Sequence, residues 1–146
     1  MIRPFTSSDR SVILEMMRTF YHSPAVCHSV PESYFNTTID TVLNGSPYAE
    51  GWLVEQDGQP AGYGLIAKTY SNEVGGLVVW LEELYISENF RGLGLGSKLI
   101  GFIENQYHDR AARFRLEVSD SNERARRLYQ KLGYECLPYD QMIKDQ

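Results

Sequence analysis

Two adjacent carboxylates and a group of three glycines lie close together past the middle of this chain. Glu82 and Glu83 stand in an apolar stretch, and Arg91 is followed by glycines at positions 92, 94 and 96 and then by a helical pattern. Glycine lets backbone N–H groups turn toward one point, because positive φ costs it little. A following helix adds unpaired N–H groups and the positive end of its dipole. The segment predicts a phosphate or pyrophosphate site, and a Gly-rich surface turn is the plain alternative.

The spacing of these glycines excludes two common phosphate-binding loops. A Walker loop needs Gly, four residues and then Gly-Lys-Ser or Gly-Lys-Thr, and the chain has no such run. A dinucleotide-binding loop needs G-x-G-x-x-G early in a βαβ unit, with an acid about 20 residues later. The glycines of this chain have a different spacing and come too late for that arrangement.

The pattern Arg91-x-x-Gly94-x-Gly96 resembles the acyl-CoA loop of the GNAT family of N-acetyltransferases. The likeness extends to the strand before the loop and to Asn122, which six residues separate from Tyr129-Gln-Lys-Leu-Gly-Tyr134. It covers residues 78–136 well and the first half of the chain only in the order of its elements. The resemblance implies an acetyl-CoA-dependent N-acetyltransferase that acts on the amine of a small molecule or on an exposed amino group.

The resemblance also assigns the residues that would contact acetyl-CoA. The strand before the loop would offer backbone groups to the pantetheine arm, and the loop would bind the pyrophosphate. Asn122 would bind the same arm, and it is also a natural helix N-cap. The implied cofactor-binding residues are Leu84, Tyr85, Ile86, Arg91, Gly92, Leu93, Gly94, Leu95, Gly96, Ser97, Asn122 and Ala125.

Acetyl transfer to an amine needs a base for the amine and a proton for the leaving thiolate. The resemblance gives the first role to Glu82, often acting through water, and the second to Tyr129 as general acid. Neighbouring side chains on a strand point to opposite faces, so Glu83 is predicted to face away from Glu82, as a substrate contact or the alternative base. The alternative for Tyr129 is an ordinary core aromatic on the apolar stripe of its helix.

The acceptor pocket is expected to come from the first half of the chain. Tyr21, His28 and Tyr34 are the candidate contacts there, since aromatic rings and acids together suit a cationic amine. Core packing is the alternative for the tyrosines, and a surface position is the alternative for the histidine. Residues 1–90 carry a net charge of −7 and residues 91–146 one of +2, which would suit a cationic acceptor and an anionic donor.

Two other functions remain open at this point. A noncatalytic acyl-CoA sensor or regulatory protein could keep the same fold, and a different anion-binding domain could use the same turn. The joint presence of a strand carboxylate, Asn122 and Tyr129 favours the enzyme, because a protein that merely binds acyl-CoA needs only the loop. The sequence does not indicate which amine is the acceptor.

Composition predicts one folded domain over residues 1–146, with 42% hydrophobic residues. No apolar run approaches ~18 residues and the N-terminus lacks a signal-peptide pattern, so no membrane association is expected. Two distant cysteines predict thiols rather than a disulfide, with the cytoplasm as the default location. A net charge of −5 argues against nucleic-acid binding. No Cys or His group has metal-ligand spacing, so no metal is predicted.

Periodicity predicts the elements that would position these residues. Helices are expected up to about residue 21 and over 31–43, 95–106 and 123–132, with Gly133 ending the last one. Strands are expected at 2–5, 52–55, 61–70, 77–87, 114–118, 134–137 and 141–144.

The order β-α-α-β-β-β-α-β-α-β-β matches the arrangement of GNAT domains. The resemblance implies a single α/β (α+β) domain with a mixed, mostly antiparallel sheet of six to seven strands and about four helices. The fourth and fifth strands would splay apart and hold the acyl-CoA in the gap. Dimers are common in the family, so a homodimer is compatible with the resemblance, and the sequence leaves the oligomeric state open.

Overall fold

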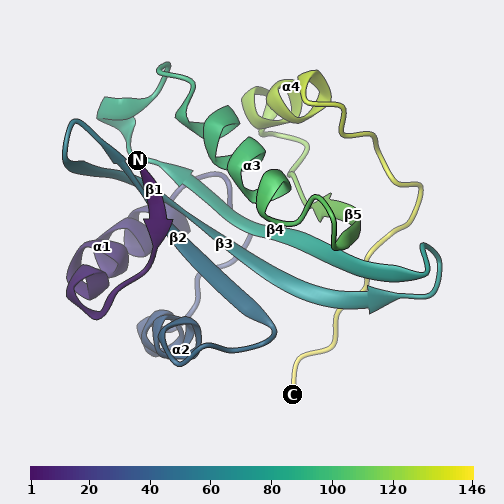
Figure 1. The fold of residues 1–146 in the computed structure, drawn as a ribbon, viewed down its shortest axis with the longest axis horizontal. Coiled ribbons are helices and arrows are strands. Elements are labelled where there is room, and N and C mark those ends of the chain that lie inside the picture. The colour runs from purple at the N-terminus through teal and green to yellow at the C-terminus, as the bar shows by residue number, and fades with distance from the viewer.

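Helices cover both faces of a five-stranded sheet in the computed structural model, which describes residues 1–146 (Figure 1). The strands are β1 (Ile2–Pro4), β2 (Ala49–Gln56), β3 (Gln59–Ser71), β4 (Gly76–Ile86) and β5 (Ala111–Leu116). The helices are α1 (Arg10–Tyr21), α2 (Glu32–Leu43), α3 (Leu95–Gln106) and α4 (Glu123–Lys131), with short 3-10 turns η1 (Ser7–Asp9) and η2 (Glu88–Phe90). None of the helices is both long and apolar enough to cross a membrane.

Strand pairing follows the order of the chain from β1 to β5. Neighbours are antiparallel up to β4, and β5 alone lies parallel to its neighbour, β4. A parallel return needs a crossover, which α3 supplies. The pairing of β4 with β5 stops at Leu81 and Leu116, although β4 continues to Ile86. The end of β4 therefore has no partner strand on its β5 side, as the predicted splay requires.

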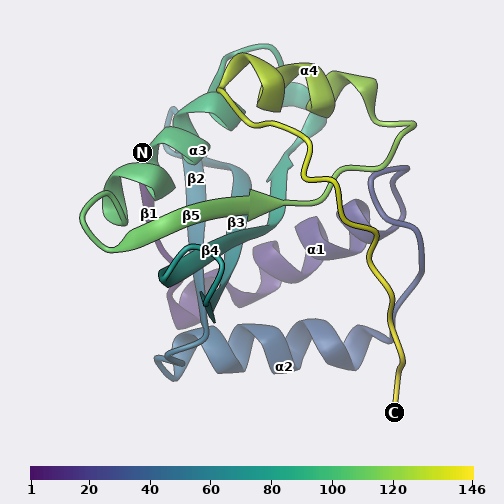
Figure 2. The same ribbon diagram turned by 90° about the vertical axis from the view of Figure 1, so that its right-hand side faces the viewer.

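Two apolar cores attach the helices to the two faces of the sheet. α1 and α2 pack on one face, where Ile13 and Ile39 are fully buried. α3 packs on the other face through Leu99 and Ile103, with α4 beside it (Figure 2). The four helices and the mixed sheet agree with the predicted layout, and all elements before residue 132 form with small shifts at their ends.

The two strands expected at residues 134–137 and 141–144 do not form, so the sheet has five strands rather than six to seven. The only backbone hydrogen bond within residues 135–146 runs from the Tyr139 N–H to the Leu137 carbonyl. Pro138 lies between the two short segments and has no N–H to donate. Met142 and Ile143 remain exposed. The prediction was wrong because an apolar pattern of four residues does not secure pairing with a strand edge.

A buried ion pair connects β1 to the start of α1. Asp9 is 7% exposed and accepts hydrogen bonds from the Arg3 guanidinium at 2.8 and 2.9 Å and from the Thr6 N–H at 2.8 Å. Arg3 also donates to Glu55 of β2 at 2.8 Å. The bonds from Arg3 are the main reason why the pKa of Asp9 lies well below its usual range. The pair positions α1, whose last residue is Tyr21.

Asp9→Asn is expected to lower the free energy of unfolding at neutral pH by about 2–3 kcal/mol, because a charge-assisted pair is lost in a buried position. The folded-state pKa of Asp9 is depressed, so the carboxylate stabilises the fold above its unfolded pKa. This contribution is lost as the pH falls toward the folded pKa. Urea denaturation at several pH values should therefore show that the difference in the free energy of unfolding between variant and wild type becomes smaller toward about pH 3. The control is Asp109→Asn, which alters an exposed carboxylate. Equal losses in the two variants would contradict this role for Asp9.

Candidate active site

The glycine loop enters α3 through residues with left-handed backbone conformation. Gly92 has a φ of 83°, and Gly94, the N-cap of α3, has a φ of 74°. Residues other than glycine rarely adopt this left-handed backbone region, because their Cβ atom crowds the following carbonyl oxygen. No side chain caps α3, so the first N–H groups of the helix are free to donate. The loop and the helix start together form a group of donors suited to an anion.

A cavity of about 570 Å³, here termed the loop cavity, opens between this loop, the end of β4 and the start of α4. It is lined by every predicted cofactor-binding residue except Leu93, which is 53% exposed. The predicted residues that line it are Leu84, Tyr85, Ile86, Arg91, Gly92, Gly94, Leu95, Gly96, Ser97, Asn122 and Ala125. Phe20 and residues 23–25 also line it, and sequence reasoning missed them because no pattern relates the end of α1 to the distant loop.

Both ends of α4 have the capping predicted from the sequence. The Asn122 side-chain oxygen accepts the Ala125 N–H at 3.2 Å. Gly133 has a φ of 91°, and its N–H and that of Tyr134 each donate at 3.0 Å to carbonyls in the last turn. These caps fix the position of Tyr129, which lies on the face of α4 turned toward the loop cavity.

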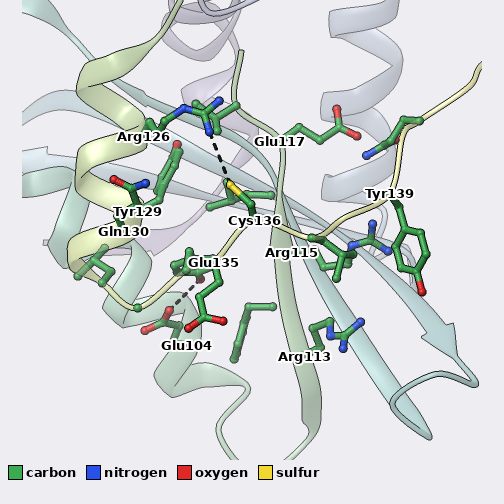
Figure 3. A pocket seen from close by; sticks show the side chains of 18 residues that line it. Glu104, Arg113, Arg115, Glu117, Arg126, Tyr129, Gln130, Glu135, Cys136 and Tyr139 are labelled. Atoms are coloured by element: carbon green, nitrogen blue, oxygen red, sulfur yellow. Dashed lines mark hydrogen bonds between the residues drawn. The ribbon is translucent and has the colours of Figure 1, made fainter. Parts of the chain in front are cut away.

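A second cavity of about 770 Å³, here termed the edge cavity, runs along the outer side of β5 (Figure 3). It is bounded by β5, by α4 and by residues 132–141. Its charged lining residues are Glu104, Arg113, Arg115, Glu117, Arg126 and Glu135. Tyr129 is the one residue that lines both cavities.

The Tyr129 phenol is a protonated donor at the junction of the two cavities. Burial raises the pKa of Tyr129, so the hydroxyl keeps its proton at neutral pH. The ring packs near Tyr134, with centroids 6.1 Å apart. No side chain of the protein accepts from the Tyr129 hydroxyl, whereas the Tyr134 hydroxyl donates to Glu104 at 2.8 Å. The Tyr129 proton is therefore available to a ligand.

A β-bulge in β4 determines where the two strand carboxylates lie. Leu65 of β3 pairs with Glu83 and the next residue, Ile66, pairs with Leu81, so Glu82 is an extra residue without a partner. An extra residue interrupts the alternation of side chains along a strand. Leu81 packs in the core beneath α3, whereas the Glu83 side chain lies on the α1 face.

The bulge removes the regular alternation that would otherwise decide to which face Glu82 turns. Burial is the main cause that raises the pKa of Tyr21 at the end of α1, and the charges of both glutamates add to it. The expectation that the two side chains point to opposite faces therefore stays a prediction. It rested on unbroken alternation, and the bulge, which depends on the register between β3 and β4, interrupts that alternation at Glu82.

The two carboxylates nevertheless differ in their contacts. Glu83 accepts the hydroxyls of Tyr21 at 2.7 Å and Tyr63 at 2.6 Å; burial raises its pKa, and these two bonds oppose the rise. Glu82 is exposed, lines neither cavity and has no donor within the protein. Its pKa is raised by its partial burial and then by the charges of Glu117 and Glu83. Glu82 is thus the carboxylate that is free to accept a proton from a ligand.

The other two predicted acceptor contacts, His28 and Tyr34, lie away from the two carboxylates and the two cavities. His28 is exposed in the connection between α1 and α2, Tyr34 is 59% exposed, and neither lines the loop cavity or the edge cavity. Sequence reasoning missed Glu117, the first residue beyond β5, which stands across the strand gap from Glu82. The alternation of charged and apolar residues in β5 predicted a strand, but not that its charged side chains line a cavity.

Comparisons with known proteins match most of the chain. The model of the acetyltransferase (GNAT) family matches residues 13–134. A thialysine N-epsilon-acetyltransferase of Mus musculus is 29% identical over 150 residues, covering 93% of this chain and 84% of the relative. A spermine/spermidine N(1)-acetyltransferase of Bacillus subtilis (strain 168) is 27% identical over 142 residues, covering 92% and 86%. The solved structure of AAC(6')-Iy in complex with the bisubstrate analogue CoA-S-monomethyl-acetylneamine has the same fold, with a TM-score of 0.82 at 16% identity over 100% of this chain and 97% of that one.

Proposed function

This chain belongs to the GNAT family of acetyltransferases and is an amine N-acetyltransferase, and from that premise we propose that acetyl-CoA is its donor and a small cationic alkylamine its acceptor. One observation carries the proposal. Tyr129 lies where the cavity lined by the predicted donor-binding residues meets the cavity that contains Glu117, the neighbour of Glu82. The proposal therefore places a proton donor, Tyr129, and a proton acceptor, Glu82, at the gap between β4 and β5.

The loop cavity supports acetyl-CoA as the donor. Glycine backbone and the free N-terminus of α3 suit a pyrophosphate, and Arg91 and Arg124 line the same cavity. The end of β4, which lacks a partner strand, offers the backbone of residues 84–86 to the amide groups of a pantetheine arm, as a strand would. Bound acetyl-CoA supplies an activated thioester, and Tyr129 supplies the proton for the departing thiolate.

The carboxylates support a cationic acceptor. An alkylammonium has a pKa near ~10.4 and must lose a proton before its nitrogen can attack. Glu82 takes this proton, directly or through a water molecule, because its oxygens have no donor in the protein. Glu83 and Glu117 add negative charge on either side and favour a positively charged ligand. The relatives named for thialysine and for spermine and spermidine also act on small amines with additional positive charge.

The cytoplasm is the proposed location, because Cys27 and Cys136 are free and exposed, as is usual in a reducing compartment.

A homodimer, common in the family, is part of the proposal, and light scattering at several protein concentrations tests it. A monomer mass at all concentrations would contradict the homodimer without affecting the proposed reaction.

Binding and turnover can be tested separately. Calorimetric titration should show that acetyl-CoA binds, and thiol release should then follow addition of thialysine, spermidine or another small cationic amine. Absence of acetyl-CoA binding would contradict the proposed donor. Binding without turnover of any amine would favour the noncatalytic acyl-CoA sensor.

Gly94→Ala is expected to weaken acetyl-CoA binding about tenfold, because a side chain in the left-handed region costs roughly 1–2 kcal/mol and the loop would shift to avoid it. Calorimetry measures the change in Kd. Gly101→Ala is the matched control, since Gly101 lies within α3 and an added Cβ would meet no atom within 4 Å beyond its chain neighbours and the backbone of its own helix. That variant should bind normally and gain about 0.5–1 kcal/mol of stability. Unchanged affinity in Gly94→Ala would show that the loop backbone does not bind the donor.

A further inference from the structure

We propose that Arg115 binds a carboxylate of the acceptor, so that the preferred acceptor is a small amino acid with a terminal side-chain amine rather than a polyamine. The inference rests on the proposed function, since it takes Glu82 and Tyr129 as the groups at the reacting end. It adds a residue that determines specificity, and with it the chemical class of the acceptor.

Arg115 is an arginine of the edge cavity without an acidic partner. Its guanidinium carbon lies 4.1 Å from the ring centroid of Trp80, and the side chain is half-buried. The two other arginines that line this cavity, Arg113 and Arg126, form ion pairs at 3.0 and 2.9 Å. Stacking on an aromatic ring orients a guanidinium and leaves its N–H groups at the edge free for a carboxylate. Arg115 is thus oriented and still able to bind an anion.

The position of Arg115 relative to the acids matches the length of an amino acid. Arg115 lies near the end of β5 and Glu117 is the first residue beyond it, so extended backbone separates their Cα atoms by about 6.6–6.8 Å. Glu117 stands beside Glu82 across the strand gap and lines the same cavity as Arg115 (Figure 3). Lysine has six bonds between its terminal nitrogen and its carboxylate carbon, as many as the backbone of two residues. When fully extended, these bonds span at most ~7 Å. A ligand of this length can place its amine near the acids and its carboxylate at Arg115.

The same guanidinium disfavours a diamine of equal length. Such a ligand would bring a second ammonium group to the position where an amino acid places its carboxylate. Like charges repel more strongly in a partly desolvated cavity than in water. Arg115 therefore distinguishes the two classes through an attraction and a repulsion together.

The test uses acceptor pairs that differ only in the carboxylate. L-lysine is compared with cadaverine, and thialysine with bis(2-aminoethyl) sulfide, using the full chain, acetyl-CoA and initial rates of thiol release. We expect the wild type to prefer the carboxylated member of each pair about tenfold or more in kcat/KM. Arg115→Gln should lower kcat/KM for that member by about tenfold to hundredfold. The decarboxylated member should be used as well as before or better, and Arg115→Lys should restore part of the preference.

Arg113→Gln is the matched control, because Arg113 lines the same cavity but is paired with Glu73. It should leave the ratio of the two kcat/KM values unchanged. A wild type that prefers the decarboxylated members would overturn the inference. An Arg115→Gln variant that loses activity equally on both members would also overturn it. That result would show that Arg115 has only a structural role, through its packing on Trp80. Either result leaves the proposed function standing, whereas no turnover of any amine defeats both.

Discussion

Glu82→Gln is expected to lower kcat/KM at neutral pH by about 10²- to 10⁴-fold, the usual contribution of a positioned base. The glutamine keeps the size of the side chain but cannot accept the proton of the attacking amine. Because Glu82 must be unprotonated to act, kcat/KM of the wild type should fall at acid pH. The apparent pKa of this fall should lie above the ordinary ~4.3 of glutamate, since burial and the charges of Glu117 and Glu83 raise it. The variant should lack this acid limb.

Glu83→Gln is the comparison that separates the two carboxylates. Glu83 already accepts the hydroxyls of Tyr21 and Tyr63, so its loss should disturb packing and stability more than proton transfer. We expect a decrease in kcat/KM of about tenfold or less, with the acid limb retained. Full activity in Glu82→Gln together with an inactive Glu83→Gln would assign the base to Glu83 instead. Rates measured from about pH 5 to pH 9 for both variants decide between the two assignments.

Tyr129→Phe is expected to lower kcat by about 10²-fold or more, because the phenol that protonates the departing thiolate is lost. Its effect on stability should stay within about 0.5 kcal/mol, since the hydroxyl has no partner in the protein. Acetyl-CoA should still bind with nearly unchanged Kd, because the cavity keeps its shape. Steady-state kinetics, calorimetry and urea denaturation measure the three quantities.

Tyr134→Phe gives the opposite expectation. The Tyr134 hydroxyl donates to Glu104 at 2.8 Å, so its removal should cost about 1–2 kcal/mol of stability. Activity should change less than in Tyr129→Phe, because Tyr134 lines the edge cavity alone and its hydroxyl is already bonded to Glu104. A Tyr129→Phe protein that folds and keeps the full kcat would contradict its role as general acid, even if Tyr134→Phe behaves as expected.

Local sequence patterns predicted the parts of the site that depend on local structure. The glycine loop, the start of α3 and both caps of α4 follow from residue types within a few positions of each other. The structure brings the residues named from these patterns to one cavity, with Leu93 as the exception. Their roles in binding and catalysis remain predictions.

Contacts between distant segments could not be predicted in the same way. The bulge at Glu82 depends on how β3 and β4 pair, and a strand pattern alone predicts unbroken alternation. Glu117 lies beside Glu82 only because the crossover through α3 returns β5 parallel to β4. His28 and Tyr34 were selected by residue type, without a constraint on where their side chains would lie. The last two predicted strands were wrong because short apolar segments around Pro138 carry no information about an edge to pair with.

Transfer of the acetyl group itself can be followed by mass spectrometry, using acetyl-CoA with a deuterated acetyl group and a single small amine. The labelled acetyl group should appear on a primary amine of the acceptor, in an amount equal to the thiol released. The Glu82→Gln and Tyr129→Phe proteins should form this product far more slowly. Thiol release that yields labelled acetate and no labelled amine, or no release at all, would contradict the conclusion that this chain acetylates amines.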